Sequence, residues 1–398
     1  MIQRDYLIVG AGIGGATVCE ALREYDPKGS VTLVGYESTL PYHRSRLFPT
    51  LLTPKAPKEP DPKTFKTLEC LPAEWYAKHN VELRLDTLVT KINLERKLAV
   101  LSSGQVIEFR KCALAMGSRP RRPQVGGANL GKILYLRGVR DVMALKEMIV
   151  TDKNVFIIGG GLVAAEAAAA LKTLGVNVQI LCSHPYLWQK WLDPETARWL
   201  TEYYASHGVP LLNETLNGFE GKTILRNIQT KSGGRFAAEL AIIAEGVEPN
   251  LGLVANTPLG SPNGTPVNDF LETDEKGIYA VGDIALYPDP IFGSVRRSEH
   301  YETAIEQGRV AGANMTGKKR QRFKAFPHFS SNVFDLHFDF VGDFSLTPVR
   351  YEIDGDPSKR RFIARYYQGP KLMGMLLCNQ EPQAMTDAEA EITLAHKH

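Results

Sequence analysis

The sequence predicts an α/β fold in which two parallel-sheet units are followed by a smaller antiparallel unit. Two glycine-rich turns, at 10–15 and 159–164, each lie between a short β-type run and an alanine-rich helical run. From about residue 325 the pattern changes to strand-like segments such as 361–367 and 372–377, which favour an antiparallel sheet. A chain of 398 residues is long enough for two or three domains of this kind.

The first glycine turn, Gly10-Ala11-Gly12-Ile13-Gly14-Gly15, follows an apolar run at 6–9 and precedes a helical run through 16–22. This order is typical of a Rossmann-like dinucleotide-binding turn. The first glycine permits the tight turn, and the second lets the backbone approach a pyrophosphate, whose charge then lies at a helix N-terminus. Glu37, after the expected strand at 31–34, has close to the spacing of the acid that binds a ribose hydroxyl.

The second turn, 159–164, follows the apolar run 155–158 and opens a helix with strong intrinsic propensity. Two such turns predict two nucleotides on one chain, and this combination indicates electron transfer between them. At the end of the next strand, 176–181, an NAD-binding domain normally carries an acid. Cys182 and Ser183 stand there instead, and of basic residues only His184 and Lys190 are near, so the preference for NADH or NADPH stays open.

Composition narrows the class of protein. Hydrophobic residues make up 43% and charged residues 23%, which is ordinary for a globular enzyme, and a net charge of +3 is too small to indicate nucleic acid. No run approaches the roughly 18 apolar residues of a membrane helix, and the apolar start leads straight into the first turn. We therefore expect a cytoplasmic protein without a membrane or nucleic-acid partner.

The cysteines are the second compositional signal. Five of them are widely scattered, and no CxxC pair occurs. This spacing argues against a metal site and against a redox-active disulfide formed by cysteines close in sequence. The C-terminal tail 386–394 predicts a short helix, with Thr386 as its N-cap.

Taken in order, the motifs resemble those of FAD-dependent pyridine nucleotide oxidoreductases of the ferredoxin-reductase type. These two-dinucleotide-fold flavoproteins include oxygenase-coupled ferredoxin reductases, rubredoxin reductases and apoptosis-inducing factor. The resemblance covers essentially the whole chain. It rests on Gly10-x-Gly12-x-x-Gly15, Leu40-Pro41-Tyr42-x-Arg44, Gly117-x-Arg119-Pro120, Gly159-x-Gly161 with Glu166, Thr273 through Gly282-Asp283, Glu299-His300, Gln307-Gly308, and Asn314-Met315-Thr316-Gly317.

The resemblance implies a glutathione-reductase-like organisation with three domains. A discontinuous FAD-binding domain would comprise 1–117 and 246–324, and an NAD(P)-binding domain would comprise 118–245. A small C-terminal α+β domain, 325–398, would cover the flavin. The implied cofactors are FAD and a nicotinamide nucleotide, with no metal.

The resemblance also implies roles for individual residues. Glu166 and Tyr301 would lie near the reacting rings, as catalytic residues. Asp283 would bind the ribityl chain of FAD, and a hydrogen bond to its charged carboxylate would contribute about 1.5–3 kcal/mol. Arg44 would approach the FAD phosphates or the flavin. The full set of implied cofactor-binding residues is Gly10, Gly12, Gly14, Gly15, Glu37, Arg44, Arg46, Gly117, Arg119, Gly159, Gly161, Leu162, Val163, Cys182, Ser183, Lys190, Gly246, Gly282, Asp283, Glu299, His300 and Tyr301.

The chain departs from the family pattern around the flavin. Many relatives carry a lysine that pairs with the glutamate matching Glu166, and Pro49 takes the place of that lysine here. Arg46 is the candidate substitute, but its planar fork gives a different geometry. Without a cation, desolvation is expected to raise the pKa of Glu166 and alter flavin reactivity. Tyr301 and Ser330 stand where relatives carry tryptophan, and Ser330 cannot stack on a ring.

The leading hypothesis is an FAD-dependent NAD(P)H oxidoreductase that passes electrons to a one-electron carrier. The implied carrier is a small acidic iron–sulfur protein, a ferredoxin or rubredoxin, docked by basic stretches at 119–122, 296–297 and 318–322. One alternative is an NAD(P)H oxidase or quinone reductase. Another is a flavin-binding interaction module that resembles apoptosis-inducing factor. The electron acceptor and the oligomeric state, monomer or homodimer, stay open.

Overall fold

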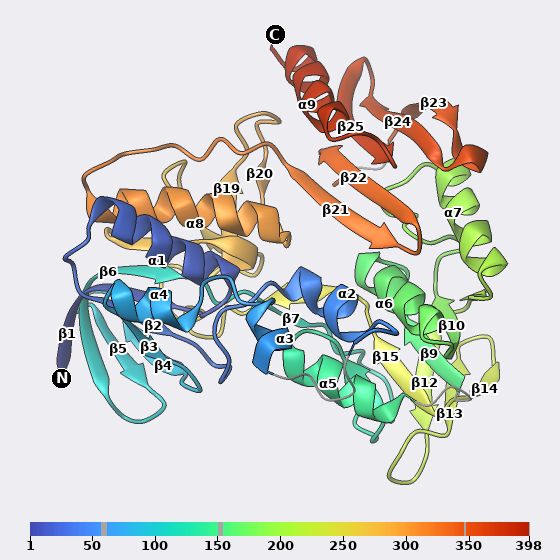
Figure 1. Cartoon of the computed structure of the whole chain (residues 1–398), viewed down its shortest axis with the longest axis horizontal. Helices are drawn as coiled ribbons and strands as arrows, with labels where there is room; N and C mark the ends of the chain where they lie inside the picture. Colours follow the sequence, from blue (N-terminus) through green and yellow to red (C-terminus); the bar gives the residue numbers. More distant parts are fainter. Residues whose placement is uncertain (57–61, 150–153, 346–347, 398) are drawn as a thin grey trace. The chain divides into compact units, whose positions relative to one another are not determined.

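The computed structural model describes residues 1–56, 62–149, 154–345 and 348–397 (Figure 1). The chain divides into two compact units. The first unit comprises 1–43, 62–119 and 248–326, and the second comprises 44–61, 120–247 and 327–398. Each unit is described by itself below. The division into an FAD domain, an NAD(P) domain and a C-terminal domain remains a proposal.

The first unit is built on a sheet with the strand order β3-β2-β1-β6-β5-β4, and β18 lies beside β6. Val9 at the end of β1 pairs with Val34 of β2 and with Leu114 of β6, so the carboxyl ends of these parallel strands meet at the first glycine turn. The bounds are β1 Ile2–Val9, β2 Val31–Val34, β3 Val81–Arg84, β4 Val89–Asn93, β5 Leu98–Leu101, β6 Val106–Leu114 and β18 Ile278–Ala280.

Two helices of this unit, α1 (Ile13–Tyr25) and α8 (Tyr301–Thr316), lie side by side and run in the same direction (Figure 1). A Cβ on Gly308 would lie 2.8 Å from Cβ of Thr17, and one on Gly312 would lie 2.7 Å from Cβ of Ala21. These distances are too short for real side chains, so the two glycines permit the close approach of the helices. Both helices therefore begin at the edge of the sheet that carries the first glycine turn.

The remaining elements of the first unit are short. They are α3 (Pro62–Lys66), α4 (Ala73–Lys78), β17 (Thr265–Pro266), η2 (Gly282–Ile284), β19 (Ala285–Pro288) and β20 (Val295–Arg296). The chain passes between the units through β7 (Ser118–Pro120) and β16 (Val247–Pro249). No helix in the described part of the chain is long and apolar enough to cross a membrane.

The second unit contains a parallel sheet with the strand order β11-β10-β9-β15-β8. Its strands are β8 (Ile133–Tyr135), β9 (Asn154–Ile158), β10 (Asn177–Cys182), β11 (Leu211–Asn213) and β15 (Leu240–Ile243). A three-stranded antiparallel sheet consists of β12 (Leu216–Glu220), β13 (Asn227–Thr230) and β14 (Arg235–Ala237). The helical elements are η1 (Arg44–Arg46), α2 (Leu47–Leu51), α5 (Val139–Met148), α6 (Leu162–Thr173) and α7 (Pro194–Ser206). The parallel strands β3-β2-β1-β6-β18 of the first unit and the parallel sheet of the second unit confirm the predicted α/β class.

The C-terminal part of the second unit is a five-stranded antiparallel sheet, as predicted, with the order β21-β22-β25-β24-β23. Its elements are β21 (His328–Val333), β22 (Leu336–Gly342), β23 (Arg350–Asp356), η3 (Pro357–Lys359), β24 (Arg361–Gln368), β25 (Lys371–Cys378) and α9 (Gln383–Ala395). The prediction of Thr386 as the N-cap of the last helix is wrong, because α9 begins at Gln383. Pro382 precedes it with φ −54° and so already has a helical conformation, which proline tolerates at a helix start.

Candidate active site

The first glycine turn leaves an open space at the start of α1. A Cβ on Gly10, which has φ +116°, would lie 2.1 Å from the carbonyl oxygen of Ala115, and one on Gly15 would lie 2.0 Å from that of Gly10. Packing therefore requires glycine at both positions. A Cβ on Gly12 would meet nothing within 4 Å, and Gly12 supplies no side-chain cap to α1. The helix N-terminus is thus open to an anion, as a pyrophosphate group requires.

The acid expected to bind ribose follows β2 directly. Glu37 is partly buried, and its Oε2 accepts a hydrogen bond of 2.6 Å from the hydroxyl of the buried Tyr42. Tyr36, the residue before Glu37, has 65% of its surface exposed. Glu37 is therefore the carboxylate held in place at this strand end. Sequence reasoning missed the role of Tyr42, although the residue belongs to a quoted motif.

Asp283 is a buried carboxylate in the first unit, with 8% of its surface exposed. The hydroxyl of Ser118 donates to its Oδ2 over 2.5 Å. The preceding residue, Gly282, has φ +70°, and its N–H donates to Oε1 of the fully buried Gln307 over 2.7 Å. These contacts orient Asp283 at the end of β18. Such a carboxylate is a suitable acceptor for a hydroxyl of the ribityl chain.

The start of α8 lies beside the first glycine turn and beside the residue that precedes Asp283. A Cβ on Gly14 would lie 3.8 Å from Cβ of Ala304, and one on Gly282 would lie 3.4 Å from the same atom. Ala304 thus links the glycine turn to the residue before Asp283. Tyr301, the first residue of α8, is 39% exposed.

The two residues before α8 are held by local contacts. His300 is the N-cap of α8, and its backbone N–H donates to the hydroxyl of Ser298 over 3.4 Å. Glu299 forms an ion pair of 2.7 Å with Arg297. The negative charge of Glu299 is therefore already compensated within the first unit.

The second glycine turn is covered by the segment that follows β10. A Cβ on Gly159, which has φ +128°, would lie 2.3 Å from the carbonyl oxygen of Ala244, so this position requires glycine. A Cβ on Gly161 would lie 3.6 Å from the indole ring of Trp191. The N–H of Trp188 donates to the carbonyl of Gly160 over 2.9 Å. Sequence reasoning missed both tryptophans, because only the fold brings the segment 183–192 across the turn.

Cys182 occupies the position of the usual NAD-binding acid, but its thiol is buried. Only 4% of the residue is exposed, and a Cβ on Gly160 would lie 2.5 Å from its Sγ. Burial raises the pKa of this thiol, which accepts a hydrogen bond of 3.4 Å from the N–H of His184. Ser183 and Lys190 are exposed, and the Lys190 ammonium lies 5.9 Å from the ring centre of Trp191. Cys182 is thus a packing residue of the turn.

Glu166 lies on α6, and its carboxylate is held by neutral donors. The Ser331 hydroxyl donates to Oε1 over 2.7 Å, and the backbone N–H of Asn332 also donates to the carboxylate. Burial outweighs these two hydrogen bonds and raises the pKa of Glu166 to about 7. The expected direction of this shift is confirmed. Within the described residues no cation lies within ion-pair distance of Glu166, and Arg46 is exposed.

The other expected cofactor residues lie in turns and at element ends. Gly117 and Gly246 have φ of +65° and +91°, which glycine adopts readily. Arg44 donates to the carbonyl of Arg137 over 3.2 Å, and Arg119 pairs with Glu248 over 2.6 Å. The first two residues of α6 are Leu162 and Val163, and Val163 is 42% exposed. Their roles toward a cofactor remain proposals.

Residues 4–308 match the pyridine nucleotide-disulphide oxidoreductase family, and the chain belongs to this family. It is therefore an oxidoreductase, and the family is one of FAD-containing, NAD(P)H-dependent reductases. The five cysteines are all free in this structure.

Three similar proteins illustrate the relationship. The chain is 30% identical to peroxisomal monodehydroascorbate reductase 4 of Arabidopsis thaliana, over 85% of this chain and 72% of that protein. It is 29% identical to rubredoxin-NAD(+) reductase of Pseudomonas putida, over 78% and 80% of the two chains. The crystal structure of a covalent putidaredoxin reductase–putidaredoxin complex matches with a TM-score of 0.91 and 26% identity, and the match covers 99% of this chain and 94% of that one.

Proposed function

We propose that this chain is an FAD-dependent NAD(P)H oxidoreductase that passes electrons to a small iron–sulfur carrier protein. One structural observation carries the proposal. The N-terminus of α1 is open at Gly12, and the buried carboxylate of Asp283 lies beside the helix pair α1 and α8. A second glycine turn at Gly159 supports a second nucleotide. The similarity to a rubredoxin reductase and to a putidaredoxin reductase solved with its partner supports the type of acceptor.

The residues present fit FAD in the first unit. Bound FAD would supply the chemistry that accepts a hydride from the nicotinamide and releases electrons one at a time. The N–H groups at the start of α1 would bind its pyrophosphate, and Glu37 would accept a ribose hydroxyl. Asp283, oriented by Ser118, would accept a ribityl hydroxyl. The N-terminus of α8, next to Tyr301, would stabilise negative charge that develops on the ring system.

Glu166 would act in this reaction through its proton. With a pKa of about 7, this carboxyl is close to half protonated at neutral pH. It therefore would hold or release a proton as charge changes nearby, a role that a permanently ionised glutamate paired with lysine cannot fill.

The basic stretches differ in how much of their positive charge is left to attract an acidic carrier. Arg296 and Arg297 are compensated by Asp289 and Glu299, and Arg322 by Asp269. Their net positive charge toward a partner is thereby reduced. The described residues provide no ion-pair partner for the side chains of Arg121 and Arg122. We therefore propose the stretch 121–122 as a better candidate contact for a carrier than 296–297.

An anaerobic titration of the purified protein with NADH and NADPH in parallel tests the reductase function. Fast bleaching of flavin absorption by one nucleotide, followed by reoxidation on addition of a rubredoxin or a ferredoxin, is the expected result. It also decides the nucleotide preference that the buried Cys182 leaves open. Bound flavin that neither nucleotide reduces promptly would contradict the proposal and favour the interaction-module alternative.

A second candidate function is reduction of a small molecule without a carrier protein. The similarity to a monodehydroascorbate reductase, at 30% identity, favours this candidate. Rapid NAD(P)H turnover with the monodehydroascorbate radical or a quinone, and slow turnover with iron–sulfur carriers, would establish it.

We also propose that the protein is cytoplasmic. Cell fractionation of the native protein tests this location.

A further inference from the structure

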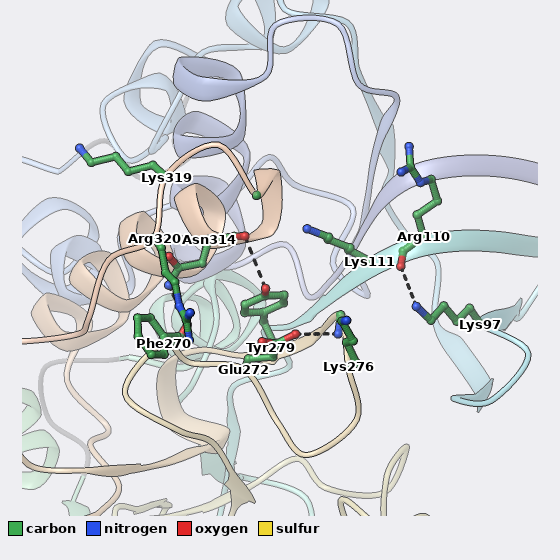
Figure 2. Close-up of a pocket in the computed structure, with 12 residues that line it drawn as sticks. Lys97, Arg110, Lys111, Phe270, Glu272, Lys276, Tyr279, Asn314, Lys319 and Arg320 are labelled. Carbon is green, nitrogen blue, oxygen red and sulfur yellow. Dashed lines mark hydrogen bonds between the residues drawn. The ribbon is translucent and has the colours of Figure 1, made fainter.

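The first unit contains a cavity of about 340 Å³ at the far end of α8 (Figure 2). Asn314 and Gly317, at the C-terminal end of this helix, line it. The first glycine turn contacts α8 near Gly308, and the rise from Gly308 to Gly317 is about 13 Å. Because α1 and α8 run in the same direction, the cavity lies at the opposite end of the helix pair from the open N-terminus of α1. It is therefore separate from the proposed FAD site.

The lining of this cavity is strongly basic. It includes one carboxylate, Glu272, together with Phe270, Gly277 and Tyr279. Figure 2 shows the basic side chains arriving from several separate segments of the first unit. These six cationic residues are Lys97, Arg110, Lys111, Lys276, Lys319 and Arg320. For comparison, the net charge of the whole chain is only +3.

Most of these cations are held by neutral groups. Lys97 donates to the carbonyl of Arg110 over 3.2 Å, and Lys111 donates to that of Met315 over 2.5 Å. The ammonium of Lys319 donates to the hydroxyl of Tyr25 over 2.9 Å. The guanidinium of Arg320 lies 4.1 Å from the ring centre of Phe270.

Ion pairing compensates little of this charge. Arg110 pairs with Asp5 over 3.1 Å, and no other of the six cations has an ion pair within the described residues. The single lining carboxylate, Glu272, accepts a hydrogen bond of 2.8 Å from the N–H of Gly277, so one of its oxygens already binds the backbone. The protein itself therefore does not supply enough negative charge for this cavity.

The pKa of Lys111 reflects this excess of positive charge in the cavity. Burial lowers its pKa, and the neighbouring charges of Arg110, Lys97 and Lys276 lower it further, while Glu272 acts in the opposite direction. A cation among other cations in a partly desolvated place is costly unless an anion joins it. A multivalent anion would remove this cost more effectively than a monovalent one.

We propose that this cavity binds a compact polyphosphate anion, a di- or triphosphate. Its volume is near the lower limit of small-molecule sites, roughly 300–1,000 Å³, which suits a compact ion better than the face of a protein. Lysine ammonium groups and an arginine fork are the donors that phosphate oxygens prefer. The guanidinium groups of Arg320 and Arg322 already lie 4.1 and 5.5 Å from the ring centre of Phe270, so this ring already has two cationic partners.

The test is isothermal titration calorimetry of the FAD-loaded protein with sodium tripolyphosphate. The test variant is Lys97→Gln/Lys276→Gln, which removes two lining charges without touching the core. The control variant is Lys222→Gln/Lys231→Gln, which removes two exposed charges from the second unit. We expect saturable binding to the wild type, at least tenfold weaker binding to the test variant, and a change below twofold in the control. Flavin absorption and the unfolding temperature verify that all three proteins are folded.

Three results would overturn the proposal. The first is the absence of saturable binding to the wild type, and the second is binding that the test variant does not weaken more than the control does. The second result would assign the anion to the nicotinamide turn or to general surface charge. A slower reduction of a carrier protein by the test variant, without any tripolyphosphate binding, would likewise overturn it in favour of a docking surface.

Two sources of the anion are distinguished by repeating the titration with ADP. The compared quantity is the factor by which the test variant weakens binding of each ligand. If this factor is larger for ADP than for tripolyphosphate, the natural ligand is the phosphate end of a nucleotide. If it is not, the ligand is a free polyphosphate. Both results support a polyphosphate site. The outcome is independent of the reductase function, since neither the ligand nor the variants involve flavin reduction.

Discussion

The hydroxyl of Ser331 donates to Oε1 of Glu166 over 2.7 Å, and it joins a strand of the C-terminal sheet to the helix that follows the second glycine turn. The family resemblance implies that many relatives pair the corresponding glutamate with a lysine. Here the partners are a hydroxyl and a backbone N–H. A neutral donor stabilises the charged carboxylate less than a cation does, so burial prevails and the pKa rises to about 7.

Ser331→Ala should raise the pKa of Glu166 further, because it removes a hydrogen bond to the charged form. Such a bond is worth about 1.5–3 kcal/mol, which corresponds to a rise of about 1–2 in the pKa. The measurement is the pH profile of flavin reduction by the preferred nicotinamide nucleotide. Ser330→Ala is the matched control, because the Ser330 hydroxyl donates to Asp339 instead. Equal profiles for the Ser331 variant and the wild type would argue against the positioning role of Ser331.

Glu166→Gln should change the pH dependence of stability. A glutamate carboxyl in water has an ordinary pKa of 4.5, and in the folded protein the pKa of Glu166 is about 7, so the folded state binds more protons between these values. Its contribution to stability is therefore fully present below about pH 4.5 and is lost as the pH rises toward 7. The loss is at most about 3 kcal/mol. Unfolding temperatures from pH 4 to 8 should fall less steeply for the variant than for the wild type, and parallel curves would contradict this account.

Gly12→Ala and Gly10→Ala should separate cofactor binding from folding. The added methyl group at Gly12 enters open space where the pyrophosphate would lie, so the variant should fold and lose at least tenfold in FAD affinity. At Gly10 the added Cβ would lie 2.1 Å from a backbone oxygen in a left-handed conformation, so that variant should be strongly destabilised. FAD content after gel filtration and the unfolding temperature measure the two effects. Retention of FAD by a folded Gly12→Ala protein would refute the assignment of this turn.

Cys182 should be inert toward alkylation in the folded protein. Its thiol is buried and its pKa is raised, and Cys19, Cys112 and Cys378 are buried as well. Only Cys70 is partly exposed, so iodoacetamide at pH 7.5 should modify Cys70 first, as peptide mass spectrometry would show. Cys182→Ala should keep its nicotinamide affinity within about threefold. A large loss of affinity would mean that the thiol contacts the nucleotide directly.

Local spacing determined a large part of the architecture. The strand predicted at 31–34 matches β2, and both glycine turns stand between a strand and a helix as predicted. Glycine conformation, strand pattern and helix propensity act over a few residues, and so they can be recognised in the sequence. The order of the motifs also indicated the family that the comparison confirms.

Only the tertiary structure decided which partners these residues have. Ser118 meets Asp283, and Ser331 meets Glu166, across long stretches of chain. Trp191 lies over the second glycine turn, and the basic cavity gathers side chains from several segments. Such pairs depend on how whole sheets and helices pack, and a serine or lysine carries no local signal of its distant neighbour. The sequence by itself thus determined the fold class and the two turns, whereas packing decided the charge balance around Glu166 and within the cavity.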